Sequence, residues 1–246
     1  MSSICLTPKE TTDTLVQSAI KKASFPIGKR MLLSIMAGAY ISLGAQGFLA
    51  AYGNSFIRAS VFPVGLMMIV LVGGELFTGN CLMTFGLIQK EITLKEYINT
   101  LIQVIIGNFL GALLIAALLY MGGVYNNPKL AEAAISVAKS KASIPFVQVL
   151  FRGILCNVLV TLAVWFASTS KDTMGKLFGC WFPVMLFVLC GYEHVVANMF
   201  FIPVGMMLDS SVAMAGAASN LVASAIGNYI GGGILIPFIY NHIYYN

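Results

Sequence analysis

Long stretches without a charged residue fill most of the chain. They extend over residues 31–57, 59–74, 76–89, 97–128, 153–170, 177–192, 195–208 and 210–241. A helix needs about 20 apolar residues to cross a bilayer, so the stretches on either side of Glu75 are each marginal, as are those on either side of Glu193 and His194. We interpret each pair as one interrupted helix. The pattern then predicts six membrane-spanning helices, of which the second and the fifth are broken.

Composition agrees with an all-α integral membrane protein. Of the 246 residues, 59% are hydrophobic and only 9% are charged, whereas a soluble domain carries about 25% charged residues. The cations behind the net charge of +5 are scattered, so membrane lipid and not nucleic acid is the expected partner. The five cysteines lack the spacing of metal ligands, and we expect no metal, disulfide or other cofactor.

Residues 1–25 predict an amphipathic helix that lies on the membrane surface. Thr7-Pro8-Lys9-Glu10 has the form of a capping box with proline at the first helical position. Glu10 and Asp13 interrupt the segment, so it is no cleavable signal. A partly ordered tail is the alternative. The apolar residues that recur on one face are Leu15, Val16, Ala19, Ile20 and Ala23.

Lysine and arginine are unevenly divided between the two sides of this arrangement. One side holds nine of them and the other holds four, when Arg152 inside the fourth span is left out. Because positive residues accumulate in cytoplasmic loops, we expect both termini in the cytoplasm and the chain in the inner (plasma) membrane. The nine are Lys9, Lys21, Lys22, Lys29, Arg30, Lys90, Lys95, Lys171 and Lys176, and the four are Arg58, Lys129, Lys139 and Lys141.

The two halves of the chain resemble each other at an offset of about 120 residues, which indicates an internal repeat. Each half holds three spans, an odd number, so the repeat is inverted, and broken helices at corresponding positions then point to the substrate site. We expect a single channel domain over 1–246, with repeats at 29–121 and 142–243 and a polar connection before the second. The matches are 62–64 with 182–184, Glu75 and Asn80 with Glu193 and Asn198, and 107–111 with 227–231.

The break in the second span is Gly73-Gly74-Glu75-Leu76-Phe77-Thr78-Gly79-Asn80. Helices that start in the two breaks from opposite sides direct two partial positive charges at one point, which favours an anion and argues against a cation channel. Thr78 can donate a hydrogen bond to a passing solute; a hydroxyl bonded to its own helix is the alternative. At the same depth we expect an apolar filter, formed by Leu66, Leu76, Phe77 and Phe187. The alternative is that these side chains make ordinary helix or lipid contacts.

The break in the fifth span is Gly191-Tyr192-Glu193-His194-Val195-Val196-Ala197-Asn198. A histidine near mid-membrane is costly unless it is paired or functional, and imidazole titrates near neutral pH. We therefore expect His194 to face the pore and to exchange a proton with a weak-acid anion. A hydrogen-bonded core histidine is the alternative.

Other polar residues near the breaks are expected to support them. Glu75 and Glu193 occupy equivalent positions, where a carboxylate can accept N–H groups at a helix start. Lys141 on the outer face is expected to attract anions, and a solvated loop lysine is its alternative. The asparagines expected to tie loops to helices are Asn80, Asn108, Asn157, Asn198 and Asn228.

Together with Gly153-Ile154-Leu155-Cys156-Asn157, the motifs at 73–79 and 191–199 resemble the formate/nitrite transporter family over nearly the whole chain. The resemblance implies a homopentamer with one aquaporin-like pore in each protomer. It also implies passage of small monovalent anions of weak acids, namely formate, nitrite, hydrosulfide and relatives, and it is somewhat nearer to the hydrosulfide-channel branch. We expect no enzymatic activity.

The resemblance also implies residue roles in a passive or proton-coupled pore. Thr78 is matched to the loop threonine of the second span, and His194 is matched to a pore histidine. The resemblance implies that this histidine lies between two apolar slits and transiently protonates the anion. The remaining matches are Leu66, Leu76 and Phe187 with apolar constrictions, Phe62 with an outer constriction, Asn157 and Asn198 with asparagines near the pore, and Lys141 with the lysine before the fourth span.

Three other functions fit the sequence less well. A neutral-solute pore for water, glycerol or ammonia fits six spans, but the Asn-Pro-Ala pair of aquaporin breaks is missing. An intramembrane enzyme needs clustered ligands or a nucleophile with its base, and the second histidine, His242, lies at the far C-terminal end. A structural scaffold does not need polar breaks. The N-terminal helix is a candidate gate.

Overall fold

The computed structural model describes residues 5–245, and helices form almost all of this range. Strand pairing among the described residues is limited to one isolated bridge between Cys5 and Ser170. The elements of the first half are α1 (Pro8–Ala23), α2 (Ile27–Ala50), α3 (Ser55–Val61), α4 (Val64–Val72), α5 (Phe77–Asn80), η1 (Cys81–Met83), α6 (Thr84–Ile88) and α7 (Leu94–Met121).

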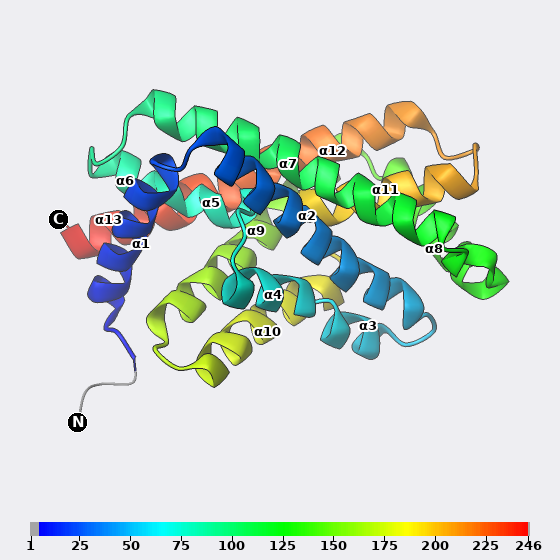
Figure 1. Cartoon of the computed structure of the whole chain (residues 1–246), viewed down its shortest axis with the longest axis horizontal. Coiled ribbons are helices and arrows are strands. Elements are labelled where there is room, and N and C mark those ends of the chain that lie inside the picture. The colour runs from blue at the N-terminus through cyan, green and yellow to red at the C-terminus, as the bar shows by residue number, and fades with distance from the viewer. Residues whose placement is uncertain (1–4, 246) are drawn as a thin grey trace.

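The second half repeats this order of elements. It comprises η2 (Val124–Asn126), α8 (Pro128–Ser143), α9 (Phe146–Thr169), α10 (Thr173–Leu189), α11 (Val195–Leu208), α12 (Met214–Tyr229), the π-helical turn η3 (Ile230–Leu235) and α13 (Ile236–Tyr245). Figure 1 shows the long helices extended along the longest axis, with α1, α6 and α13 at one end and α8 at the other. We call these the α1 end and the α8 end.

Five helical stretches are long and apolar enough to cross a membrane, namely Ile27–Ala50, Ser55–Val72, Leu94–Met121, Phe146–Thr169 and Met214–Tyr245. The apolar stretches Phe77–Ile88, Thr173–Leu189 and Val195–Leu208 are shorter. Phe77–Ile88 continues the second span beyond its break, and the other two form the halves of the fifth. The arrangement is compatible with six crossings, and the predicted interruptions of the second and fifth are confirmed.

The helix α1 forms as predicted, but its apolar face contacts the protein. The capping box is present, because Thr7 N donates to Glu10 Oε2 (2.7 Å) and Glu10 N donates to Thr7 Oγ1 (3.3 Å). Leu15, Val16 and Ala19 are buried where α1 packs on α6, η1 and α9. The expectation that this face lies on the membrane surface is therefore wrong, since helices of the same chain cover it.

The predicted polar connection before the second repeat contains the helix α8. Both α8 and α1 have 16 residues and begin with proline at the first helical position. Their N-caps are Thr7 and Asn127, whose side chain accepts from Lys129 N (3.1 Å). The repeat therefore includes a short amphipathic helix before each set of three spans.

Two close helix crossings depend on glycines at equivalent positions of the two halves. A Cβ at Gly111 in α7 would overlap the carbonyl oxygen of Ile35 in α2. A Cβ at Gly231 would overlap the carbonyl oxygen of Ile154 in α9 in the same way. Small residues let membrane helices approach at backbone distance, so each half brings its first and third spans together by the same means.

Candidate functional site

The first break lies between α4 and α5 and is held by Asn108 from α7. Gly73 ends α4 with φ of 103°, a conformation that favours glycine. Asn108 Oδ1 accepts from Phe77 N (2.9 Å), and its Nδ2 donates to the carbonyl oxygens of Ser34 (2.8 Å) and Glu75 (2.9 Å). One buried amide thus satisfies backbone groups that a non-helical segment leaves open.

Asn228 holds the second break with the same three bonds. Gly191 has φ of 68° at the corresponding turn. Asn228 Oδ1 accepts from Val195 N (2.9 Å), and its Nδ2 donates to the carbonyl oxygens of Gly153 (2.8 Å) and Glu193 (2.9 Å). The hydrogen-bond pattern therefore follows the repeat found in the sequence.

Glu75 in the first break is bonded to two partners from different elements. It accepts from Asn80 Nδ2 (2.6 Å) and from Lys22 Nζ (2.8 Å), while Lys22 also donates to Asn80 Oδ1 (2.8 Å). Lys22 lies near the end of α1, and its contact with Glu75 links that helix to the break. Lys22 is not among the site residues predicted from the sequence, although the spacing of Pro8 and Pro128 by 120 residues indicates that α1 belongs to the repeat.

Glu193 has an equivalent set of partners in the second break. Both of its carboxylate oxygens accept from Lys141 Nζ (3.0 Å each), and Oε2 also accepts from Asn198 Nδ2 (2.7 Å) and Asn220 Nδ2 (3.3 Å). The Lys141 side chain is 15% exposed and that of Glu193 is 4% exposed. Lys141 is therefore neither a solvated loop lysine nor an uncompensated charge. Asn220 is a further partner that is not among the residues predicted from the sequence.

Thr78 and His194 meet between the two breaks. Thr78 Oγ1 lies 3.0 Å from His194 Nε2, and both residues are buried. His194 is the N-cap of α11, because its Nδ1 lies 3.1 Å from Ala197 N. A backbone N–H can only donate, so Nδ1 is the acceptor and the neutral ring carries its proton on Nε2. His194 then donates to Thr78, whose hydroxyl hydrogen is free to point elsewhere.

Asn157 in α9 connects this pair to the support of the second break. Its Nδ2 donates to the carbonyl oxygens of Asn228 (2.6 Å) and Thr78 (3.3 Å). Its Oδ1 is buried and has no partner among the described residues. The two breaks are therefore joined through buried amides as well as through Thr78 and His194.

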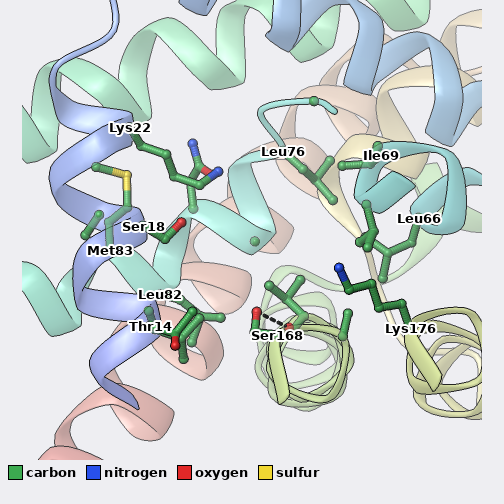
Figure 2. A pocket seen from close by; sticks show the side chains of 18 of the residues that line it. Thr14, Ser18, Lys22, Leu66, Ile69, Leu76, Leu82, Met83, Ser168 and Lys176 are labelled. Atoms are coloured by element: carbon green, nitrogen blue, oxygen red, sulfur yellow. Dashed lines mark hydrogen bonds between the residues drawn. The ribbon is translucent and has the colours of Figure 1, made fainter. Parts of the chain in front are cut away.

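A cavity of about 380 Å³ lies at the α1 end, between α1 and the first break (Figure 2). Leu66, Leu76 and Asn80 line it on the side of the first broken span, and Lys22 lines it from α1. Lys176 of α10 also lines it, so the cavity is bounded by cationic and apolar side chains together.

A second cavity of about 90 Å³ lies at the α8 end and includes His194. Phe187 stacks on the imidazole, with ring centroids 5.7 Å apart and 18° between the planes. Phe62 meets Phe187 edge-on at 5.7 Å. Lys141 also lines this cavity, with its Nζ 5.6 Å from the Phe201 ring centroid.

The two cavities are separated by a buried layer. They share no lining residue, and Thr78 lines neither of them. Leu66 and Leu76 bound the first cavity, and Phe187 and His194 bound the second. Phe77 is buried in the hydrophobic core and lines neither cavity. We call the buried layer between the two cavities the barrier.

The cavity linings also show that the two broken spans run in opposite directions. Phe62 lines the cavity at the α8 end, whereas Val70, further along the first broken span, lines the cavity at the α1 end. In α10 the order is reversed, since Lys176 is at the α1 end and Phe187 at the α8 end. The second repeat is therefore inverted relative to the first.

An inverted helical repeat with a broken helix in each half and a cavity at either end defines a membrane channel or transporter. The chain belongs to the formate/nitrite transporter family, since the family model described as formate/nitrite transporter matches residues 9–242. It is thus a multi-pass membrane protein, and the identification from sequence is confirmed.

Relatives support this assignment along the whole chain. A probable formate transporter of Methanothermobacter thermautotrophicus is 35% identical over 271 residues and covers 99% of both chains. Among solved structures, an FNT family ion channel matches with a TM-score of 0.88 and 27% identity, over 95% of this chain and 98% of that one. A pentameric formate channel with formate bound matches with a TM-score of 0.76 and 25% identity, over 89% and 98%.

Proposed function

We propose that the chain forms a pore for small monovalent anions of weak acids, with formate, nitrite and hydrosulfide as the candidate substrates. The observation that carries the proposal is the Thr78–His194 pair in the layer between two cavities on opposite sides. Formate is supported further by the formate channel and the probable formate transporter among the similar proteins.

Several features of the barrier favour an anion over a cation or a neutral polyol. The helices that begin at Phe77 and Val195 start in the two breaks, one on either side of the barrier, and helix starts carry partial positive charge. Thr78 and His194 supply side-chain donors there. The breaks lack the Asn-Pro-Ala pair of aquaporins, so a neutral-solute pore is the less favoured alternative.

The barrier gives His194 one of two roles toward the anion. As a neutral ring it donates a hydrogen bond from Nε2 and moves no proton. To protonate the anion it must first bind a second proton, which falls on Nδ1 and costs the cap bond from Ala197 N. We propose the second role, because a neutral acid crosses the apolar layer without the cost of a bare charge.

We also propose the membrane orientation of the chain, its oligomeric state and the roles of the residues around the pore. The chain lies in the plasma membrane with both termini in the cytoplasm, as the uneven distribution of lysine and arginine indicates. Five copies assemble, as in the pentameric relative. Leu66, Leu76 and Phe187 act as the apolar slits, and Glu75, Glu193, Asn157 and Asn198 keep the breaks in place.

The role of the donor pair is tested by replacing Thr78 with valine, which removes the hydroxyl and keeps the shape. We expect Thr78→Val to lower formate influx into liposomes by about tenfold, the scale of a hydrogen bond to a charged group. Thr14→Val is the matched control, since Thr14 lines the cavity at the α1 end away from the barrier and bonds only to Glu10 O. Equal influx through Thr78→Val and wild-type protein would place the pathway elsewhere.

A further inference from the structure

A buried arginine in the first turn of α2, Arg30, holds the end of α1. The residue is 7% exposed, and among the described residues it has no carboxylate partner. Its Nη1 donates to Gln103 Oε1 (2.9 Å) in α7. Its Nη2 lies within hydrogen-bond distance of three carbonyl oxygens at the end of α1, those of Ala23 (2.8 Å), Phe25 (3.0 Å) and Lys22 (3.3 Å). Arg30 therefore joins α1 to α2 and α7.

The backbone of α1 balances the charge of this guanidinium. The last carbonyl groups of a helix have no partner within the helix and carry partial negative charge. A planar guanidinium presents five N–H donors, so one arginine reaches several of these oxygens at once. Buried polar and charged groups without partners are costly. Arg30 and the end of α1 therefore hold each other in place, because separation leaves buried groups of both without their partners.

The second repeat bonds the corresponding carbonyl by means of a different residue. Lys141 corresponds to Lys22, since each pairs with the glutamate of its own break. The carbonyl oxygen of Lys141 accepts from Asn220 Nδ2 (3.0 Å) in α12. The offset of 120 residues that matches α7 with α12 places Thr100 at the position of Asn220. Thr100 is buried, and its Oγ1 has no hydrogen-bond partner among the described residues. The first repeat thus lacks this amide.

Arg30 supplies the donor that the first repeat lacks. Its counterpart in the second repeat is Val149, because each is the fourth residue after the proline at the N-cap of its helix, Pro26 or Pro145. Val149 is buried and offers no side-chain donor. Each repeat therefore places one side-chain donor on the carbonyl of the lysine beside its break, although the donor comes from a different helix. This agreement points to a requirement on the position of that lysine.

We propose that Arg30 is a positioning residue of the pore, which fixes the backbone at Lys22 so that its ammonium stays on Glu75 and Asn80. The inference rests on the proposed function and adds a residue that acts on the first break from a distance. Arg30 lines neither cavity, whereas Lys22 extends from α1 into the cavity at the α1 end (Figure 2). Displacement of Lys22 leaves the buried Glu75 carboxylate unpaired, and an unpaired negative charge there opposes the passage of an anion.

A double-mutant cycle tests whether Arg30 acts through Lys22. Formate influx into liposomes is measured for Arg30→Gln, Lys22→Gln and the double variant, with thermal stability in detergent as the check on folding. We expect each single variant to lower influx about tenfold, the scale of a hydrogen bond to a charged group. The double variant should stay within about twofold of the lower single variant, because both changes remove the same ion pair. A loss of about a hundredfold, as for independent roles, would overturn the inference.

Two further variants control the cycle. Lys29→Gln removes an exposed cation at the same end, which lies 4.3 Å from the Phe25 ring centroid, and should leave influx unchanged. If Arg30→Gln does not fold, Gln103→Met takes its place, because it removes the partner of Nη1 and keeps a side chain of similar length. We expect a smaller loss for Gln103→Met, roughly threefold, again shared with Lys22→Gln.

Transfer of the amide from the second repeat provides a rescue. In the Arg30→Gln background, Thr100→Asn places an amide where Asn220 lies in the other half, and we expect influx to return to within about threefold of the wild-type value. Thr100→Val in the same background has the size of threonine without an amide and should not restore influx. Equal influx of these two double variants would contradict the equivalence of Arg30 and Asn220.

Hydrogen exchange separates failure of this inference from failure of the proposed function, because it needs no substrate. Backbone amides of residues 20–25 should exchange faster in Arg30→Gln than in the wild-type protein, and Thr100→Asn should slow them again. Unchanged exchange in Arg30→Gln would overturn the inference alone. Absence of anion influx through the wild-type protein would overturn the proposed function, and with it the role in the pore that Arg30 serves.

Discussion

The two ring nitrogens of His194 have different partners, and this asymmetry decides how the residue can act. Nδ1 accepts from Ala197 N at the start of α11, while Nε2 lies 3.0 Å from Thr78 Oγ1. A second proton on Nδ1 removes the cap of α11. Protonation of His194 is therefore coupled to the start of the helix that forms one side of the barrier.

Replacement of His194 by asparagine tests the proton step. Asparagine can accept from Ala197 N as a cap, but its side chain is shorter than that of histidine, lacks Nε2 and does not titrate. We expect wild-type formate flux to rise as pH falls, and His194→Asn to flatten this dependence while the protein stays folded. Flux is measured in liposomes and corrected for leakage through protein-free lipid. An unchanged pH profile would assign His194 the role of a hydrogen-bond donor only.

Asn108 and Asn228 are the residues on which the geometry of the breaks depends most. Asn108→Ala leaves the backbone groups of Phe77, Glu75 and Ser34 without their partner, at about 1–3 kcal/mol for each buried group. We expect a clear loss of thermal stability in detergent and loss of flux. Asn99→Ala, an exposed site on the same helix, should match the wild-type protein. A stable, active Asn108→Ala protein would mean that the first break holds its shape without the amide.

At the scale of elements, α1 is fixed at both of its ends. Near its C-terminal end Lys22 is bonded to the first break. Near its N-terminal end Asp13 Oδ1 accepts from Lys9 Nζ (2.7 Å) and from Tyr245 Oη (2.6 Å) of α13. Since α1 covers the cavity at its own end, any release of this helix changes access to that cavity (Figure 2).

The attachment of α1 to α13 should depend on pH. The hydrogen bonds from Lys9 and Tyr245 lower the pKa of the Asp13 carboxyl from its usual value. A lowered pKa stabilises the folded attachment above the ordinary aspartate pKa of about 4, and this stabilisation is lost as pH falls through the folded-state pKa. We expect hydrogen exchange in residues 8–23, corrected for intrinsic rates, to increase in acid.

Replacement of Asp13 tests the same attachment without a change of pH. Asp13→Asn should show near neutral pH the faster exchange that the wild-type protein shows in acid. Asp209→Asn is the control, because Asp209 pairs with Lys139 (2.7 Å) at the α8 end and its pKa is also lowered. Equal exchange of α1 in Asp13→Asn and the wild-type protein would show that Asp13 does not hold the helix.

At the scale of the whole molecule, the sequence predicts the fold because lipid simplifies the problem. Uncharged runs locate the spans, and single charges at Glu75 and Glu193 locate the breaks. The matched Gly-Asn-x-x-Gly segments reveal the repeat. The element missed was α8, because a short helix with alternating polar and apolar residues reads as a connecting loop when the search is for long apolar runs.

The sequence predicts the positions of the breaks better than it predicts which side chains pair there. Thr78 and His194 follow from their place in the breaks. The partners Lys22 and Asn220 are far from Glu75 and Glu193 along the chain, so only the folded structure pairs them. The neutralisation of Lys141 by Glu193 has the same origin, since a formal charge count does not show which charges meet.

The measurement that tests the central claim most directly is influx of formate, nitrite and hydrosulfide, beside glycerol, into liposomes that contain the wild-type protein, at two pH values. The account predicts fast influx of at least one of the three anions with glycerol excluded. Glycerol influx without anion influx would contradict it, because the donors and helix starts at the barrier would then serve a neutral solute.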